Sequence, residues 1–255
     1  MEELEWVKEL QEEYAERKKH GVKSFHYTAD PDVSLRDSAA DGDMSARQQL
    51  LADAAESGLF VRAAENDADA EYELGELFSR IDEDDNMAKW FYKCAAEHGN
   101  IKAAFALGEM FFYNDSAKAA EYLKKATELG QDKNMVFRAC KLLGDIYLKD
   151  KDIPKDYEKA VFYYRKIAKE GSGYLRVQGL LGLARCYQAE DCPFIDTHKA
   201  FLIFSELAKI HMEVNEALGE VVFCYENGIG VEKNEKLANE LRELVKEINP
   251  WVLKK

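Results

Sequence analysis

The chain has 255 residues, of which 47% are apolar and 33% charged, and it contains only four prolines and fifteen glycines. This composition supplies an ample hydrophobic core, excludes a disordered or Pro/Gly-rich chain, and favours helices with solvated outer faces. The formal net charge of −14 disfavours nucleic acids and anionic membranes as partners, because both carry negative charge.

Residues 1–21 are predicted to form an N-terminal helix, because Leu4, Val7, Leu10 and Tyr14 recur on one side of it. The segment begins with acidic residues and has no apolar core of signal-peptide length. No apolar run approaches the roughly 18 residues that a membrane-spanning helix needs. We therefore expect a soluble cytoplasmic protein without membrane insertion.

Residues 22–44 contain turn formers and no sustained period, so they are predicted to form an irregular connection. A helical pattern resumes at 45–69, where Leu50 and Ala54 belong to what resembles the second helix of a degenerate repeat. An irregular first unit is expected where a stack of repeats is closed against water. This segment is therefore predicted to supply capping helices.

From residue 70 to residue 249, one two-helix pattern occurs five times. The first helix of each copy has a small residue or valine at an anchor position and an aromatic residue three positions later. The small residues at the anchor positions allow helices to pack closely, and the aromatic residues fill the core between the helices. The anchors are Gly75, Gly108, Gly144, Ala184 and Val222, and the aromatic residues are Phe78, Phe111, Tyr147, Tyr187 and Tyr225.

The second helix of each copy begins with an alanine and closes eleven residues later at a residue that tolerates a positive φ angle. Residues 250–255, which begin with a proline, are predicted to be a C-terminal tail. The initial alanines are Ala88, Ala119, Ala160, Ala200 and Ala238, and the closing residues are Gly99, Gly130, Gly171, His211 and Asn249.

The combined pattern A-x-x-x-L-G-x-x-Y, G-x-G-V and A-A-E-x-G resembles the Sel-like repeat family, which is related to tetratricopeptide repeats. The most similar passages are KCAAEHGNIKAAFALG and YENGIGVEKNEKLA. A tetratricopeptide array is the near alternative, but anchor spacings of up to 40 residues and the ENGIGV loop favour the Sel-like kind. The resemblance implies an all-α, right-handed α-solenoid with an irregular N-terminal cap, whose first helices line a concave groove and bind other proteins.

If the first helices line such a groove, the residues between their core positions should face a partner. Exposed aromatic residues flanked by charges serve as anchors in protein interfaces. The alternative is that these aromatic residues pack against a neighbouring repeat or the N-terminal segment. The predicted partner-binding residues are Tyr72, Glu76, Arg80, Lys102, Phe105, Glu109, Phe112, Tyr113, Lys141, Asp145, Arg185 and Phe223.

No catalytic, metal or cofactor site is predicted. The five histidines form no H-x-x-x-H pair, and the five cysteines form no C-x-x-C pair, so we expect reduced thiols with Cys192 the most exposed. The acidic stretch Asp82–Asn86 resembles the start of a calcium loop, but Met87 stands where the loop needs glycine.

The leading functional hypothesis is an adaptor or scaffold that binds a partner protein or peptide in the concave groove. An acidic inhibitor or immunity-type protein is a second hypothesis, because residues 53–85 contain twelve acidic residues against two arginines and could mask a basic effector. A hydrolase, as among cysteine-rich Sel-like proteins, is a third. It would need a nucleophile beside a base, which the repeat pattern does not supply.

Overall fold

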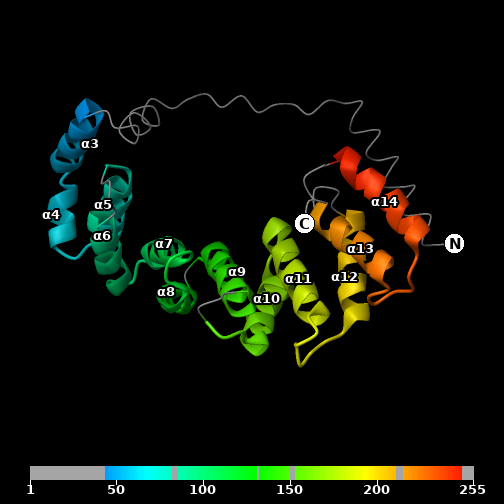
Figure 1. Ribbon diagram of the computed structural model, residues 1–255. Coiled ribbons are helices and arrows are strands. Elements are labelled where there is room, and N and C mark those ends of the chain that lie inside the picture. Colours follow the sequence, from blue (N-terminus) through cyan, green and yellow to red (C-terminus); the bar gives the residue numbers. More distant parts are fainter. Residues whose placement is uncertain (1–43, 82–85, 131, 150–152, 211–214, 249–255) are drawn as a thin grey trace. The chain divides into compact units, whose positions relative to one another are not determined.

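A computed structural model describes residues 44–81, 86–130, 132–149, 153–210 and 215–248 (Figure 1). Within these ranges the chain forms twelve helices and no strand, which confirms the all-α prediction. The predicted helix at 1–21, the connection up to residue 43, the calcium-loop-like residues 82–85, His211 and the tail at 250–255 lie outside the described residues.

The helices fall into two compact units, and within each unit successive helices pack side by side (Figure 1). The first unit contains α3 (Met44–Glu56), α4 (Leu59–Ala64), α5 (Ala68–Ile81), α6 (Asn86–Glu97), α7 (Ile101–Phe111), α8 (Ser116–Leu129) and α9 (Lys133–Lys149). The second unit contains α10 (Tyr157–Glu170), α11 (Gly173–Gln188), α12 (Thr197–Ile210), α13 (Asn215–Asn227) and α14 (Glu235–Ile248).

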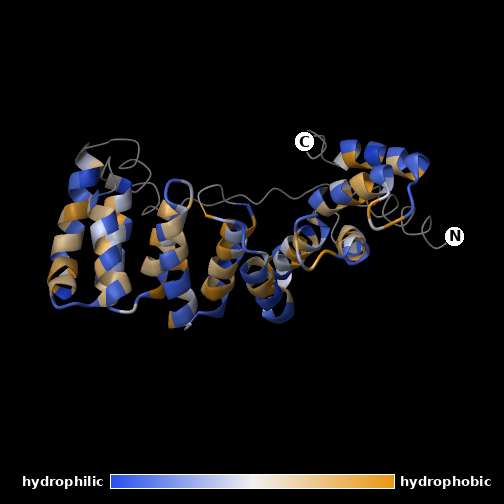
Figure 2. Ribbon diagram, turned by 60° about the horizontal axis from the view of Figure 1, so that its bottom comes forward, coloured by the Kyte–Doolittle hydropathy of each residue, from blue (hydrophilic) through white to orange (hydrophobic). Residues whose placement is uncertain are grey.

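The core forms where the repeat pattern predicts it. Apolar and polar residues alternate along each helix, as expected for helices that bury one side (Figure 2). Leu74, Leu107 and Leu143, which precede the first three anchors, are fully buried. The initial alanines of the second helices are fully buried as well. Residues 45–69 contain α3 and α4, and their assignment as a degenerate repeat stays a prediction.

The glycine anchors Gly75 and Gly108 mark points where a first helix approaches its own second helix. A Cβ atom added to Gly75 would overlap the ring of Tyr92 in α6. A Cβ added to Gly108 would lie 2.6 Å from Cγ of Leu123 in α8. In α11 the close approaches fall instead on Gly179 and Gly182, five and two positions before the predicted anchor. A Cβ added to Gly179 would meet the backbone of the preceding helix α10, and one added to Gly182 would meet the ring of Tyr164 in the same helix.

The ends of the second helices agree with the prediction in two copies and differ in one. Gly99 and Gly130 follow α6 and α8 with φ angles of 95° and 61°. Gly171 closes α10 as predicted, but its backbone is extended with φ −75° and not left-handed, and it donates its N–H to the carbonyl of Ile167. The left-handed conformation occurs two residues later, at Gly173 with φ 52°.

Candidate functional site

The first helices α5, α7 and α9 lie next to one another in the first unit. Side chains at the predicted partner-binding positions bridge these helices. Lys102 of α7 places its ammonium 5.7 Å from the ring centroid of Tyr72 in α5. Arg138 of α9 lies 3.5 Å from the carboxylate of Glu109 in α7. The first-helix surface is defined here as Tyr72, Glu76, Arg80, Lys102, Glu109, Phe112, Tyr113, Arg138, Lys141 and Asp145.

One end of this surface contains Tyr72 and Tyr92, whose ring centroids lie 5.8 Å apart beside Glu76. Tyr92 of α6 donates its hydroxyl to Glu76 at 2.6 Å, and Arg80 lies 3.6 Å from the same carboxylate. Burial raises the pKa of Tyr72 to about 12, and the charge of Glu76 adds to this effect. Burial and the bond to Glu76 also raise the pKa of Tyr92. Both phenols are therefore protonated, and able to donate, at physiological pH.

The expectation that Phe105 is an exposed anchor is wrong. Its side chain is only 4% exposed, and the guanidinium of Arg138 lies 4.5 Å from its ring centroid. The physical reason is that Phe105 lies beneath a side chain from the next first helix, which covers the ring in a cation–π contact. For this residue, packing against a neighbouring repeat is the correct alternative.

The central charges of the surface are engaged with one another. Burial raises the pKa of Glu109, an effect that the nearby Arg138 partly offsets. Lys141 lies 2.7 Å from Asp145, one turn further along α9. Such pairs contribute little stability at a surface, but they hold polar groups at defined positions.

The other end of the surface presents an exposed aromatic residue. Tyr113 lies two residues after the last residue of α7 and is 89% exposed. Phe112 is half-buried beside it, with the two ring centroids 5.0 Å apart at an interplanar angle of 87°. Tyr113 is thus the most exposed of the predicted aromatic anchors.

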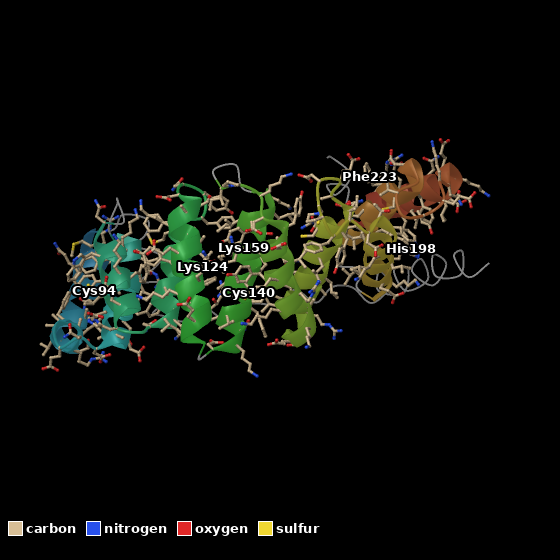
Figure 3. The ribbon with its side chains drawn as sticks, turned by 90° about the horizontal axis from the view of Figure 1, so that it is seen from below. Cys94, Lys124, Cys140, Lys159, His198 and Phe223 are labelled. Atoms are coloured by element: carbon tan, nitrogen blue, oxygen red, sulfur yellow. The ribbon has the colours of Figure 1, made fainter. Side chains whose placement is uncertain are left out.

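Two predicted residues belong to the second unit. Arg185 of α11 forms an ion pair with Glu216 of α13, which again connects two first helices. Phe223 of α13 is 47% exposed (Figure 3). These residues form a separate first-helix pair and are not part of the surface on α5, α7 and α9.

Sequence reasoning missed contacts that second-helix residues make with the first helices. Tyr92 was not among the predicted residues, because the repeat pattern assigns aromatic residues of second helices to the core. His98, which follows α6, binds the buried carboxylate of Glu71 in α5 with 2.7 Å between Nδ1 and Oε2. The spacing of the repeat indicates that His98 lies at a helix end, but it does not indicate its partner 27 residues earlier.

Four of the five cysteines are buried, and the fifth, Cys94, is partly buried. The expectation that Cys192 is the most exposed cysteine is wrong, because it is buried and its sulfur lies 3.4 Å from the backbone nitrogen of Phe194. Cys94 is half-buried, and burial raises its pKa, which disfavours the reactive thiolate (Figure 3). Within the described ranges no group of three or more His, Cys, Asp or Glu side chains could hold a metal ion. No helix in that part of the chain is both long and apolar enough to cross a membrane.

The Sel1 repeat family model matches four segments of the chain, which are residues 68–100, 101–131, 138–172 and 215–241. The first two segments contain the helix pairs α5–α6 and α7–α8. The third contains α9 from residue 138 onward and all of α10, and the fourth contains α13 and the first half of α14. Residues 173–214, predicted here as a further copy, lie between the matches although they form α11 and α12.

Several solved structures are similar to this chain, including the following three. A Sel1 repeat protein from Oxalobacter formigenes gives a TM-score of 0.55 at 21% identity, over 89% of this chain and 62% of its own. A putative Sel1 repeat protein from Klebsiella pneumoniae gives a TM-score of 0.45 at 18% identity, over 74% of this chain and 90% of its own. A protective antigen with an SLR fold from uropathogenic Escherichia coli gives a TM-score of 0.40 at 16% identity, over 84% of this chain and 63% of its own. The chain thus spans less than two thirds of the Oxalobacter and Escherichia proteins, and the first likeness shows a shared fold.

Proposed function

Because the chain belongs to the Sel1-repeat family, we propose that it is a non-enzymatic scaffold whose first-helix surface on α5, α7 and α9 receives a partner protein or peptide. Proteins built from Sel1 repeats are generally scaffolds for protein interactions. Stacked helical repeats suit this role because they present an extended surface built from equivalent positions of successive units.

The proposal rests on a row of side chains that contact one another and that ends in the exposed Tyr113. Lys102 is held over Tyr72, and Arg138 is held between Phe105 and Glu109. Groups that are already ordered lose little conformational entropy when a partner binds. Tyr113 then supplies the exposed aromatic side chain that interfaces use as an anchor.

The charge pattern of the surface favours a partner of mixed charge. Positive and negative side chains alternate across the three helices and pair with each other. The acidic residues of α5 that would mask a basic effector are engaged elsewhere: Glu73 lies 3.5 Å from Arg62, and Glu71 binds His98. The scaffold proposal is therefore preferred to an inhibitor that acts through an acidic face.

The test is affinity purification with the full chain as bait, followed by quantitative mass spectrometry. Tyr113→Ala is expected to lower the recovery of the partner about tenfold, because truncating an aromatic hot spot commonly weakens binding by more than 1 kcal/mol. Helicity should be unchanged, since the ring is exposed.

Tyr174→Ala is the matched control, because Tyr174 is also an exposed tyrosine but lies at the start of α11 in the second unit. It is expected to recover the partner as the unmodified chain does. Equal recovery of every bound protein by both variants would remove the first-helix surface from consideration.

A further inference from the structure

A second surface of different character lies on α10, a second helix. There the second unit has a hollow of about 610 Å³, lined by one face of α10 and by Phe194 from the connection between α11 and α12. The hollow follows α10 from Glu158 to Glu170, so it extends about 18 Å at the helical rise of 1.5 Å per residue. An additional helix of about three turns would span this length.

The hollow presents apolar side chains to solvent. Phe162 of α10 is 62% exposed and Phe194 is 43% exposed. Two exposed phenylalanines beside one hollow are unusual on the surface of a soluble protein and are typical of a docking site.

The cations of the hollow lack neutralising partners. Arg165, Lys166 and Lys169 line it, and none is within ion-pair distance of a carboxylate in the part of the chain that the structure describes. By contrast, Lys159 of the same helix lies 2.6 Å from Asp156. The acidic lining residues stand only at the two ends of α10. An occupant that fits this surface carries apolar side chains and an excess of carboxylates.

Residues 2–19 of this chain have both properties. Leu4, Val7 and Leu10 recur at helical spacing with Trp6 beside them, and residues 2–19 contain seven glutamates against three lysines and one arginine, of which all but Lys8 lie at positions 17–19. An amphipathic helix needs a partner for its apolar side. In the first unit, residues 53–81 contain eight acidic residues against two arginines and would repel such a segment.

We propose that residues 2–19 dock along α10 as an acidic amphipathic helix. The apolar side of the segment covers Phe162 and Phe194, and its glutamates neutralise Arg165, Lys166 and Lys169. Because the segment is tethered to the same chain, its effective concentration at the hollow is high and a modest intrinsic affinity is sufficient.

Hydrogen–deuterium exchange of the full chain tests this proposal. Amides of residues 2–19 are expected to exchange at least about tenfold more slowly than those of an unstructured peptide. The double substitution Phe162→Ser with Arg165→Glu should return them to the unstructured rate. Raising the salt concentration to about 0.5 M should also speed their exchange, because it screens the charge pairs.

The matched control is Tyr174→Ser with Arg176→Glu, which changes an exposed aromatic residue and an exposed arginine of α11. In this control variant, the amides of residues 2–19 should still exchange slowly. If the first double substitution also speeds exchange within α10, Lys169→Glu repeats the test without removing an apolar contact, and it too should release the segment.

Three results would overturn the proposal. Fast exchange of residues 2–19 in the unmodified chain would mean that the segment does not dock. Equally slow exchange in the α10 variants and the control would mean that it docks elsewhere. Slow exchange that appears only together with a dimer in sedimentation velocity would assign the occupant to a second copy.

Discussion

Gly75 and Gly108 occupy the same position in successive repeats, and each contacts a fully or almost fully buried side chain of its own second helix. At both positions the missing Cβ leaves the space that Tyr92 or Leu123 fills. This requirement is steric and local, which explains why the repeat pattern alone indicates it.

Gly75→Ala is expected to lower the free energy of unfolding by about 1–3 kcal/mol, because the added methyl group would displace the buried ring of Tyr92 and its hydrogen bond to Glu76. The steric cost and the lost hydrogen bond together outweigh the roughly 1 kcal/mol by which alanine favours a helix over glycine. Urea denaturation measures the change.

Glu73→Ala is the control for this prediction, since Glu73 lies exposed on the same helix and makes only a surface ion pair with Arg62. It should change the stability by about 1 kcal/mol at most. A Gly75→Ala protein as stable as the unmodified chain would show that α5 and α6 can separate without loss.

At the scale of the helix, the second helices α8, α10, α12 and α14 each have a capping residue four positions before their initial alanine. The side chain of this residue accepts a hydrogen bond from the backbone N–H three residues later, which satisfies one of the free donors at a helix start. The capping residues are Asp115, Asp156, Asp196 and Asn234. Their regular spacing could have been read from the sequence.

Asn100 caps a first helix and also connects two repeats. Its side-chain oxygen accepts from the N–H of Ala103, and its amide donates to Ala68 at 3.3 Å and to Asp69 at 2.8 Å. Asn100→Ala should lower stability by about 2 kcal/mol, since it removes a cap and the contacts to the preceding repeat. Thermal and urea denaturation are suitable measurements.

The comparison for this prediction is Asp115→Ala, which removes the exposed cap of α8 without an inter-repeat bond. It should lower stability by about 1 kcal/mol. If the two substitutions have equal effects, the bonds from Asn100 to α5 do not stabilise the junction of the repeats.

At the scale of the whole molecule, helices pack mainly against their sequence neighbours, and the described helices divide into two units. Stability in such arrays is approximately a sum of repeat terms and nearest-neighbour terms. A lesion in one repeat should therefore weaken adjacent helices more than distant ones.

Leu123→Ala tests this expectation, because Leu123 is fully buried in α8 and its truncation should remove about 2–5 kcal/mol. Native-state hydrogen exchange is expected to accelerate in α7, α8 and α9, with little change in α12–α14. A uniform acceleration across both units would show instead that the chain unfolds as one cooperative body.

The two-helix period, the buried leucines and the glycines that close α6 and α8 were all predictable from the sequence. These features depend on local spacing and backbone sterics, so the same residue types recur wherever the same backbone geometry recurs. The displacement of the left-handed residue from Gly171 to Gly173 was not predictable, because the closing glycine there forms an extended end.

Only the tertiary structure decided which predicted partner-binding residues are available. Phe105 and Tyr113 are both aromatic residues in or next to α7, and the sequence assigns them the same role. Arg138, which lies 33 positions after Phe105, covers its ring, whereas Tyr113 stays exposed beyond the end of the helix. Exposure is set by the side chains of a neighbouring repeat, and the pattern within one repeat contains no information about them.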